Sequence, residues 1–131
     1  MRRLFAFLPV LLLALLPFTA QACTATSETD VSTISSAIAN GHSFDKHKGE
    51  FVMGVNIGGV AYTGPTVNTN ADFAKVIAAT MASTTEKPLS SKRYAWYGGT
   101  DNVVVIFDPN SDDCGTAFRP TGGMAYYNGL S

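Results

Sequence analysis

Five consecutive apolar residues, Val103 to Phe107, constrain the fold of this chain more than any other segment. Successive side chains of a strand point to opposite faces of a sheet, so a strand that is apolar at every position is buried on both faces. Such a strand belongs in the middle of a sheet. Shorter strand patterns lie around it at residues 93–97, 116–119 and 124–127. The C-terminal third is therefore predicted to form an antiparallel sheet of about four strands.

Two helical patterns precede this sheet. Apolar residues recur at helical spacing over residues 31–38 and again over 71–82. Gly41 follows the first pattern, where a left-handed C-terminal residue is expected. Between the two helices, residues 51–62 read as a hairpin with its turn at the glycine pair 58–59. Helices first and a sheet afterwards predict an α+β fold, with the N-terminal helices packed on the C-terminal sheet.

The first 22 residues have the pattern of a signal peptide. Two arginines precede an apolar run at residues 4–18, and Ala20-Gln21-Ala22 supplies the small residues expected before a cleavage site. The run is too short for a comfortable membrane span, and no basic stop-transfer flank follows it. We expect residues 1–22 to be a signal peptide and residues 23–131 to be a single domain, periplasmic or secreted. Lipidation at Cys23 is the alternative fate of the new N-terminus.

Cys23 and Cys114 are the only cysteines of the chain. An even pair in an exported chain predicts one disulfide, which would join the mature N-terminus to the late part of the sequence. A metal site or a nucleophilic thiol is less favoured, because neither cysteine has a nearby histidine or a second cysteine at motif spacing.

The charge of the mature chain argues against general nucleic-acid affinity. Without Arg2 and Arg3, residues 23–131 carry seven basic and ten acidic side chains, a formal charge of −3. Nucleic-acid-binding proteins are usually basic overall. Any contact with a nucleic acid therefore has to come from a local site.

Both histidines of the chain, His42 and His47, lie in one short charged segment. Histidine changes protonation nearest to neutral pH, which makes this segment the natural place for proton transfer. In a helix, Phe44, His47 and Phe51 share one face, and His42 and Lys46 share another. The alternative is that His47 is an ordinary, hydrogen-bonded residue at the edge of the core.

The residue inventory favours metal-free acid–base chemistry. The sequence has no Gly-x-Ser-x-Gly nucleophile elbow and no His-x-x-x-His ligand pair, so no metal or cofactor is predicted. Cleavage of RNA through its own 2′-hydroxyl needs only a base, an acid and cations for the phosphorane. This reaction matches the residues that the chain offers.

His47 is the candidate acid or base, and Lys46 is a candidate for holding the phosphate or sharing the proton transfer. Arg119 has a guanidinium that matches phosphate geometry. Thr116 and Tyr126 are candidate hydrogen-bond donors, and Tyr126 also a second proton donor. Structural roles are the alternative for each: solvated lysines, an arginine paired with a carboxylate, and ordinary sheet residues. Three further residues are candidates for substrate binding: His42, Lys48 and Arg93.

Four segments in this order form a recognisable combination: Gly-His-Ser-Phe-Asp-Lys-His at 41–47 with Glu50-Phe51, Leu-Ser-Ser-Lys-Arg-Tyr-Ala-Trp at 89–96, residues 103–109, and Gly-Thr-Ala-Phe-Arg-Pro at 115–120. Together they resemble bacterial polymorphic-toxin ribonuclease domains. These are the C-terminal nuclease modules of contact-dependent inhibition and related toxins, in the barnase–EndoU–colicin–RelE-like class. The resemblance extends over residues 38–130.

The resemblance implies an α+β fold and metal-free RNA cleavage on the face of the sheet. The family's Lys-His pair falls on Lys46 and His47, its late Thr and Arg fall on Thr116 and Arg119, and Tyr126 matches a late tyrosine loosely. Unlike the modules it resembles, this chain carries its own export signal, and it is acidic.

We therefore expect an exported endoribonuclease toxin. The expected partners are RNA, with tRNA as one candidate, and a cognate immunity protein. We expect a monomer that does not insert stably into a membrane. The alternative is a non-catalytic periplasmic binding or inhibitor module, whose charges would serve an interface.

Overall fold

The computed structural model describes residues 23–131 apart from 52–54, 58–59, 63–66 and 100–101. Its elements are α1 (Val31–Asn40), α2 (His42–His47), the 3₁₀ helix η1 (Lys48–Phe51), β1 (Val55–Ile57), β2 (Val60–Tyr62), α3 (Asn70–Ser83), β3 (Lys87–Pro88), the 3₁₀ turn η2 (Ser90–Lys92), β4 (Tyr94–Gly98), β5 (Val103–Phe107), β6 (Gly115–Phe118) and α4 (Met124–Asn128). The predicted signal peptide and the glycine pair at 58–59 lie outside the described residues.

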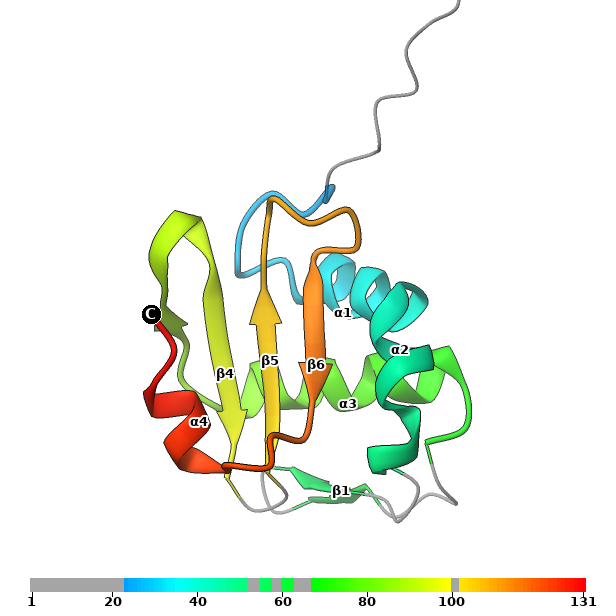
Figure 1. Cartoon of the computed structure of the whole chain (residues 1–131). Helices are drawn as coiled ribbons and strands as arrows, with labels where there is room; N and C mark the ends of the chain where they lie inside the picture. The colour runs from blue at the N-terminus through cyan, green and yellow to red at the C-terminus, as the bar shows by residue number, and fades with distance from the viewer. Residues whose placement is uncertain (1–22, 52–54, 58–59, 63–66, 100–101) are drawn as a thin grey trace, which may run out of the picture.

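A four-stranded antiparallel sheet in the order β3-β4-β5-β6 forms the centre of the molecule (Figure 1). All five residues of β5 are buried, and β5 lies between β4 and β6. This confirms the prediction that the apolar run is a central strand, because only a strand covered on both faces is uniformly apolar. With helices before the sheet in the sequence, the fold is α+β.

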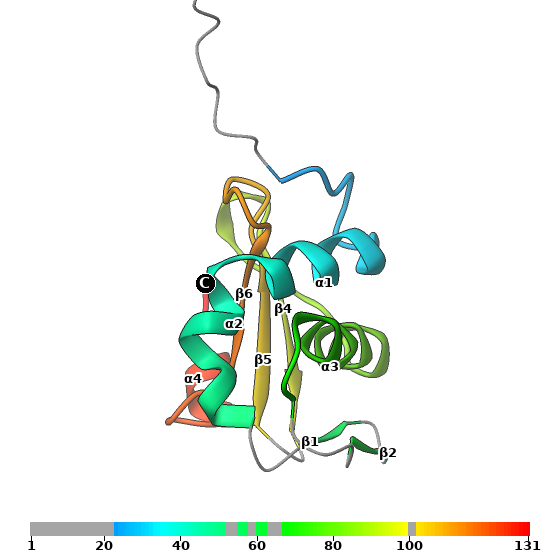
Figure 2. The same ribbon diagram turned by 90° about the vertical axis from the view of Figure 1, so that its right-hand side faces the viewer.

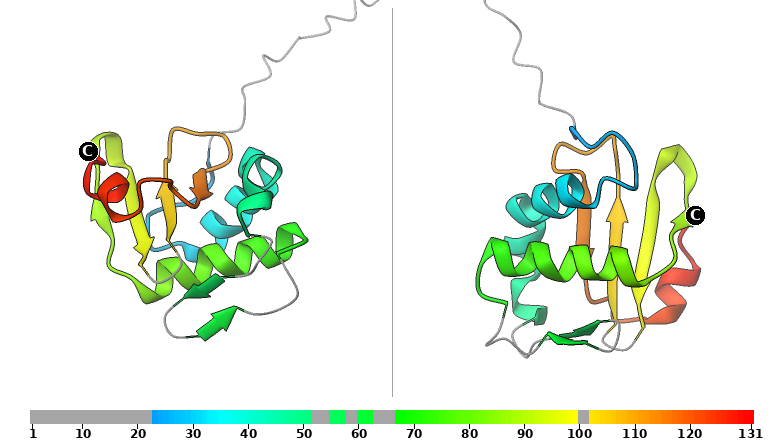
Figure 3. Two further views of the ribbon diagram at one scale, coloured as in Figure 1. Left: turned by 60° about the horizontal axis from the view of Figure 1, so that its bottom comes forward. Right: turned by 180° about the vertical axis from the view of Figure 1, so that it is seen from behind.

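Helices α1 and α3 cover one face of the sheet (Figures 2 and 3). The apolar faces of the two helices meet the inward side chains of the strands in the main core, which includes Ile34, Ile38, Phe73, Ile77, Trp96, Val105 and Ala117. The opposite face carries a smaller cluster around Val104 and Ile106, against which Tyr97, Phe118 and Tyr127 pack. Among the described residues, the short helix α4 and the C-terminus are what lies on this second face, so it is the more open one (Figure 2).

The prediction of a strand at 124–127 is wrong. Met124–Asn128 is the helix α4, and the fourth strand is the short β3 at the far edge. As a helix, this segment stacks the Tyr127 ring on Tyr97, with ring centroids 5.4 Å apart. The Lys87 ammonium donates to the carbonyls of Tyr127 and Asn128 at the C-terminal end of the helix, where the helix dipole favours a cation. These tertiary contacts determine the conformation of a segment too short to carry a clear period.

The N-terminal half agrees with the predicted elements except at Gly41. Helices α1 and α3 form, and β1 pairs with β2 as an antiparallel hairpin. Gly41 ends α1 with an extended backbone (φ −87°) instead of the left-handed one that was predicted. Glycine is required there for space, since an added Cβ would lie 2.4 Å from the Cβ of Asp113. The close approach lets α2 start directly after α1.

The predicted disulfide between Cys23 and Cys114 is present, with the two Cα atoms 4.8 Å apart. It joins residues separated by 91 positions and fixes the loop between β5 and β6 to the start of the described chain. None of the described helices is long and apolar enough to cross a membrane.

Removing this disulfide should lower the free energy of unfolding substantially. On the chain-entropy model, a loop of this length contributes up to about 4–5 kcal/mol. The double variant Cys23→Ser/Cys114→Ser should therefore unfold at a clearly lower urea concentration than the oxidised protein. Reduced wild-type protein should match the variant, and an unchanged midpoint in both would contradict the expected contribution.

Candidate functional site

Helix α2 is held against the outer edge of β6 by one buried hydroxyl. Ser43 Oγ donates to the carbonyl of Ala117 at 2.8 Å and accepts from the Ala117 amide at 3.0 Å. An edge strand exposes unpaired backbone groups that need partners when they are buried. Ser43 therefore replaces a neighbouring strand at this position and fixes the distance of the histidine segment from the sheet.

Two phenylalanines anchor the same segment in the core. Phe44 and Phe51 are buried, and both rings pack against Phe73 of α3 at centroid distances of 5.7 and 5.1 Å. This confirms the predicted apolar face. His47 lies between them in sequence but is only partly buried, and its ring stacks on Phe118 of β6 with centroids 5.2 Å apart.

The N-terminal end of α2 is held by Asp113, which precedes the disulfide cysteine. The Asp113 carboxylate accepts from the His42 amide at 3.2 Å and is paired with the Nδ1 atom of the His42 ring. Partial burial alone would raise the pKa of this carboxyl, but hydrogen bonds from Ser111 and His42 outweigh it and hold the pKa below its ordinary value. The folded structure therefore stabilises the ionised form of the Asp113 carboxylate.

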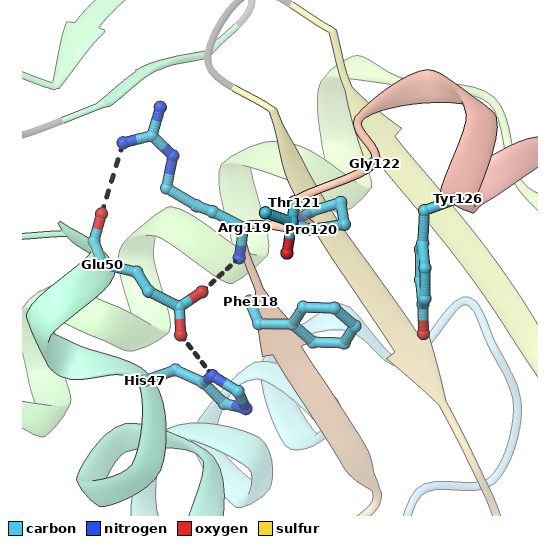
Figure 4. A pocket seen from close by; sticks show the side chains of 8 residues that line it. All are labelled: His47, Glu50, Phe118, Arg119, Pro120, Thr121, Gly122 and Tyr126. Atoms are coloured by element: carbon cyan, nitrogen blue, oxygen red, sulfur yellow. Dashed lines mark hydrogen bonds and ion pairs between the residues drawn. The ribbon is translucent and has the colours of Figure 1, made fainter.

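A hollow of about 450 Å³ lies between the end of α2, the end of β6 and helix α4 (Figure 4). Its lining includes His47, Glu50, Phe118, Arg119, Pro120 and Tyr126, together with the turn at residues 121–122. Phe118 belongs to the more open face of the sheet. The hollow therefore joins residues 47–50 to residues 118–126, which lie far apart in the sequence.

The carboxylate of Glu50 connects both sides of this hollow. One oxygen is paired with Nδ1 of His47, and the other accepts from the Arg119 backbone amide at 2.8 Å. A carboxylate at Nδ1 fixes the ring orientation and leaves Nε2 for proton transfer. Among the described residues, none forms a hydrogen bond with Nε2 of His47. The pair has the arrangement of an acid–base histidine with an orienting carboxylate.

The guanidinium of Arg119 points away from the His47 ring (Figure 4). Its Nη1 donates to the backbone carbonyl of Glu50 at 3.2 Å. Arg119 is nevertheless the one cationic residue among the described residues that line the hollow. Any contact between this group and a phosphate beside His47 requires the side chain to turn from this position.

Aromatic side chains form the wall between His47 and α4. The Phe118 ring meets the Tyr126 ring edge to face, with centroids 5.4 Å apart. Tyr126 is 39% exposed, and its hydroxyl forms no hydrogen bond with any described residue. The hollow thus presents both apolar surface and a phenolic hydroxyl.

Three of the five predicted catalytic residues line the hollow: His47, Arg119 and Tyr126. Lys46 is exposed on α2 outside the lining. Thr116 lies two residues before Phe118 on the same face of β6, and its hydroxyl is 3.3 Å from Ser43 Oγ, so its contact supports the docking of α2.

The three predicted substrate-binding residues lie elsewhere. His42 is paired with Asp113, Lys48 has its ammonium 5.8 Å from the centroid of the Phe44 ring, and Arg93 donates to the carbonyls of Ser90 and Ser131. Glu50 is the site residue that the sequence reasoning did not assign. Its signal was the spacing of three residues from His47, which places the two side chains together on a helix.

The described residues contain no group of three or more His, Cys, Asp or Glu side chains able to hold a metal ion. No protein family, curated protein or solved structure matches the chain.

The contact between Asp113 and His42 should affect the stability of the protein in acid. A carboxyl whose pKa is lower in the folded state stabilises the fold above its unfolded pKa, and this stabilisation is lost as the pH falls through the folded value. The Asp113→Asn variant should therefore be less stable than the wild type at neutral pH. Between pH 5 and pH 2, its free energy of unfolding should fall by less than that of the wild type. Urea titrations across this range measure both effects. The exposed Asp45→Asn is the matched control, and equal acid losses in Asp113→Asn and wild type would contradict the assignment.

Proposed function

We propose that this protein is an exported, metal-free endoribonuclease that cleaves RNA by transphosphorylation through the 2′-hydroxyl. The observation that carries the proposal is the His47–Glu50 pair at the edge of a hollow lined by aromatic rings and one arginine. The resemblance to polymorphic-toxin ribonuclease domains supports the same reaction through two of its matched residues, His47 and Arg119, which both line the hollow.

In the proposed reaction, Nε2 of His47 takes the proton from the ribose 2′-hydroxyl. The 2′-oxygen then attacks the adjacent phosphorus and the bond from phosphorus to the 5′-oxygen breaks. The products are a 2′,3′-cyclic phosphate and a 5′-hydroxyl end. Tyr126 is the candidate donor of the proton to the leaving 5′-oxygen, because it lines the hollow and is partly exposed.

Glu50 orients the His47 ring and stabilises the imidazolium that forms when the base takes up its proton. Arg119 is assigned the role of stabilising the negative charge of the phosphorane. To reach it, the side chain has to turn away from the Glu50 carbonyl. Lys46 and Lys48 lie outside the lining and are assigned no direct role.

Export is part of the proposal. The disulfide is stable in an oxidising compartment, which agrees with an exported protein. Export also separates the enzyme from the RNA of the producing cell. A toxin of this kind needs an immunity partner in neighbouring producer cells, as the resemblance implies.

Replacing His47 by Ala should reduce RNA cleavage by about 10²–10⁴-fold, the usual contribution of a general acid or base. Cleavage of a labelled oligoribonucleotide, with detection of the cyclic phosphate end, measures the effect. His42→Ala removes the other imidazole, outside the hollow, and should retain cleavage. Cleavage by His47→Ala at the wild-type rate would contradict the proposal. So would a wild-type protein that leaves bulk RNA and tRNA intact in both redox states, a result expected of a binding module.

Glu50→Gln should lower kcat by about 10²-fold, because small displacements of a catalytic group are costly. KM should change little, since Glu50 acts through His47 and is not assigned a contact with substrate. Steady-state kinetics on the same oligonucleotide separate the two constants. A rise in KM at constant kcat would indicate that Glu50 contacts the substrate instead.

A further inference from the structure

The hollow has little positive charge for a site that would bind a polyanion. Residues 23–131 have seven lysines and arginines, all within the described part of the chain, and Arg119 alone lines the hollow. The other six lie outside its lining, and two of them bond to the protein's own carbonyls: Lys87 to Tyr127 and Asn128, and Arg93 to Ser90 and Ser131. Attraction to many phosphates therefore cannot supply the binding energy.

Aromatic surface is what the hollow offers instead. Tyr126 is 39% exposed, in contrast to the buried aromatic residues of the main core, and it stands on the side of the hollow opposite His47 (Figure 4). Phe118 lies between the two, stacked on His47 and edge-on to Tyr126. The proline at position 120 adds apolar lining. An aromatic ring at the rim of an open hollow is suited to stacking with a planar ligand.

The hollow is large enough for a small ligand. Its volume of about 450 Å³ lies within the range of sites for small ligands. Phe118 covers part of the Tyr126 face that looks toward His47, so a base would stack on the part of the Tyr126 ring that remains exposed (Figure 4). The hollow would then take one unpaired base together with the phosphate that is cut.

We propose that Tyr126 forms the stacking surface for an unpaired nucleobase, so that the protein binds single-stranded RNA chiefly through base stacking. A base within a duplex has both faces covered by its neighbours, which excludes it from this surface. The inference rests on the proposed ribonuclease function, but it concerns recognition and is tested by binding alone.

The test uses the disulfide-bonded protein and a short fluorescein-labelled oligonucleotide that is 2′-O-methylated throughout. Methylation removes the nucleophile, so the fluorescence anisotropy reports binding without cleavage. Tyr126→Ala should raise the Kd by about 5- to 100-fold, the usual effect of removing one stacking ring. Tyr126→Phe keeps the ring and should bind like the wild type. Met124→Ala, which removes an exposed apolar side chain from the same helix, should also leave the Kd unchanged.

Two further measurements separate stacking from charge. The same oligonucleotide annealed to its complement should bind much more weakly than the single strand. The slope of log K against log salt should be about −0.7 to −1.4, as expected for one or two phosphates on a single strand. Equal binding of the duplex, a slope steeper than about −3, or an unchanged Kd in correctly folded Tyr126→Ala would each overturn the inference. Circular dichroism and thermal melting establish folding.

Failure of this inference is distinguishable from failure of the proposed function. Cleavage of unmodified RNA by a protein whose Tyr126→Ala variant binds normally would exclude the stacking role alone. Tyr126-dependent binding without any cleavage would exclude the ribonuclease and leave a single-strand-binding site. Reduced kcat in Tyr126→Phe with unchanged binding would assign the hydroxyl to proton transfer and the ring to recognition.

Discussion

The hydroxyl of Ser43 carries the contact on which the arrangement of the site depends. It takes the place of a missing strand at the edge of β6 by bonding both backbone groups of Ala117. A serine is small enough to let the helix approach the strand and has both a donor and an acceptor. This contact brings His47 within stacking distance of Phe118. Without it, the buried amide and carbonyl of the strand would lack partners, at a cost of about 1–3 kcal/mol each.

The disulfide reinforces the same junction, at the start of α2. Cys114 follows Asp113 directly, and Asp113 holds the first turn of α2 through His42. The covalent link to Cys23 therefore restricts a loop that in turn fixes the start of the histidine helix. Stability and the geometry of the hollow are coupled through this loop. The coupling is consistent with the proposed export, because such a link forms under oxidising conditions.

The hollow explains how an acidic chain could carry out the proposed reaction on RNA. Its groups are few: an imidazole oriented by a carboxylate, one guanidinium, and aromatic rings. The proposed cleavage step needs a positioned base and charge stabilisation at one phosphorus, and these groups are of the kind that could provide both. It does not need a basic surface. The formal charge of −3 on residues 23–131 argues against broad electrostatic affinity for nucleic acid and is compatible with the proposed recognition of one base.

The sequence by itself determined the fold class, the central strand at Val103–Phe107, the two main helices and the cysteine pair. Each is encoded by a local period or by composition, because burial on one or both faces dictates which positions are apolar. Tertiary structure decided the rest. Met124–Asn128 is a helix because its tyrosine stacks on Tyr97 and its carbonyls meet Lys87, contacts that no local pattern records. Glu50 joins the site because its carboxylate reaches the backbone of Arg119, a partner 69 residues away that only the folded chain brings into range.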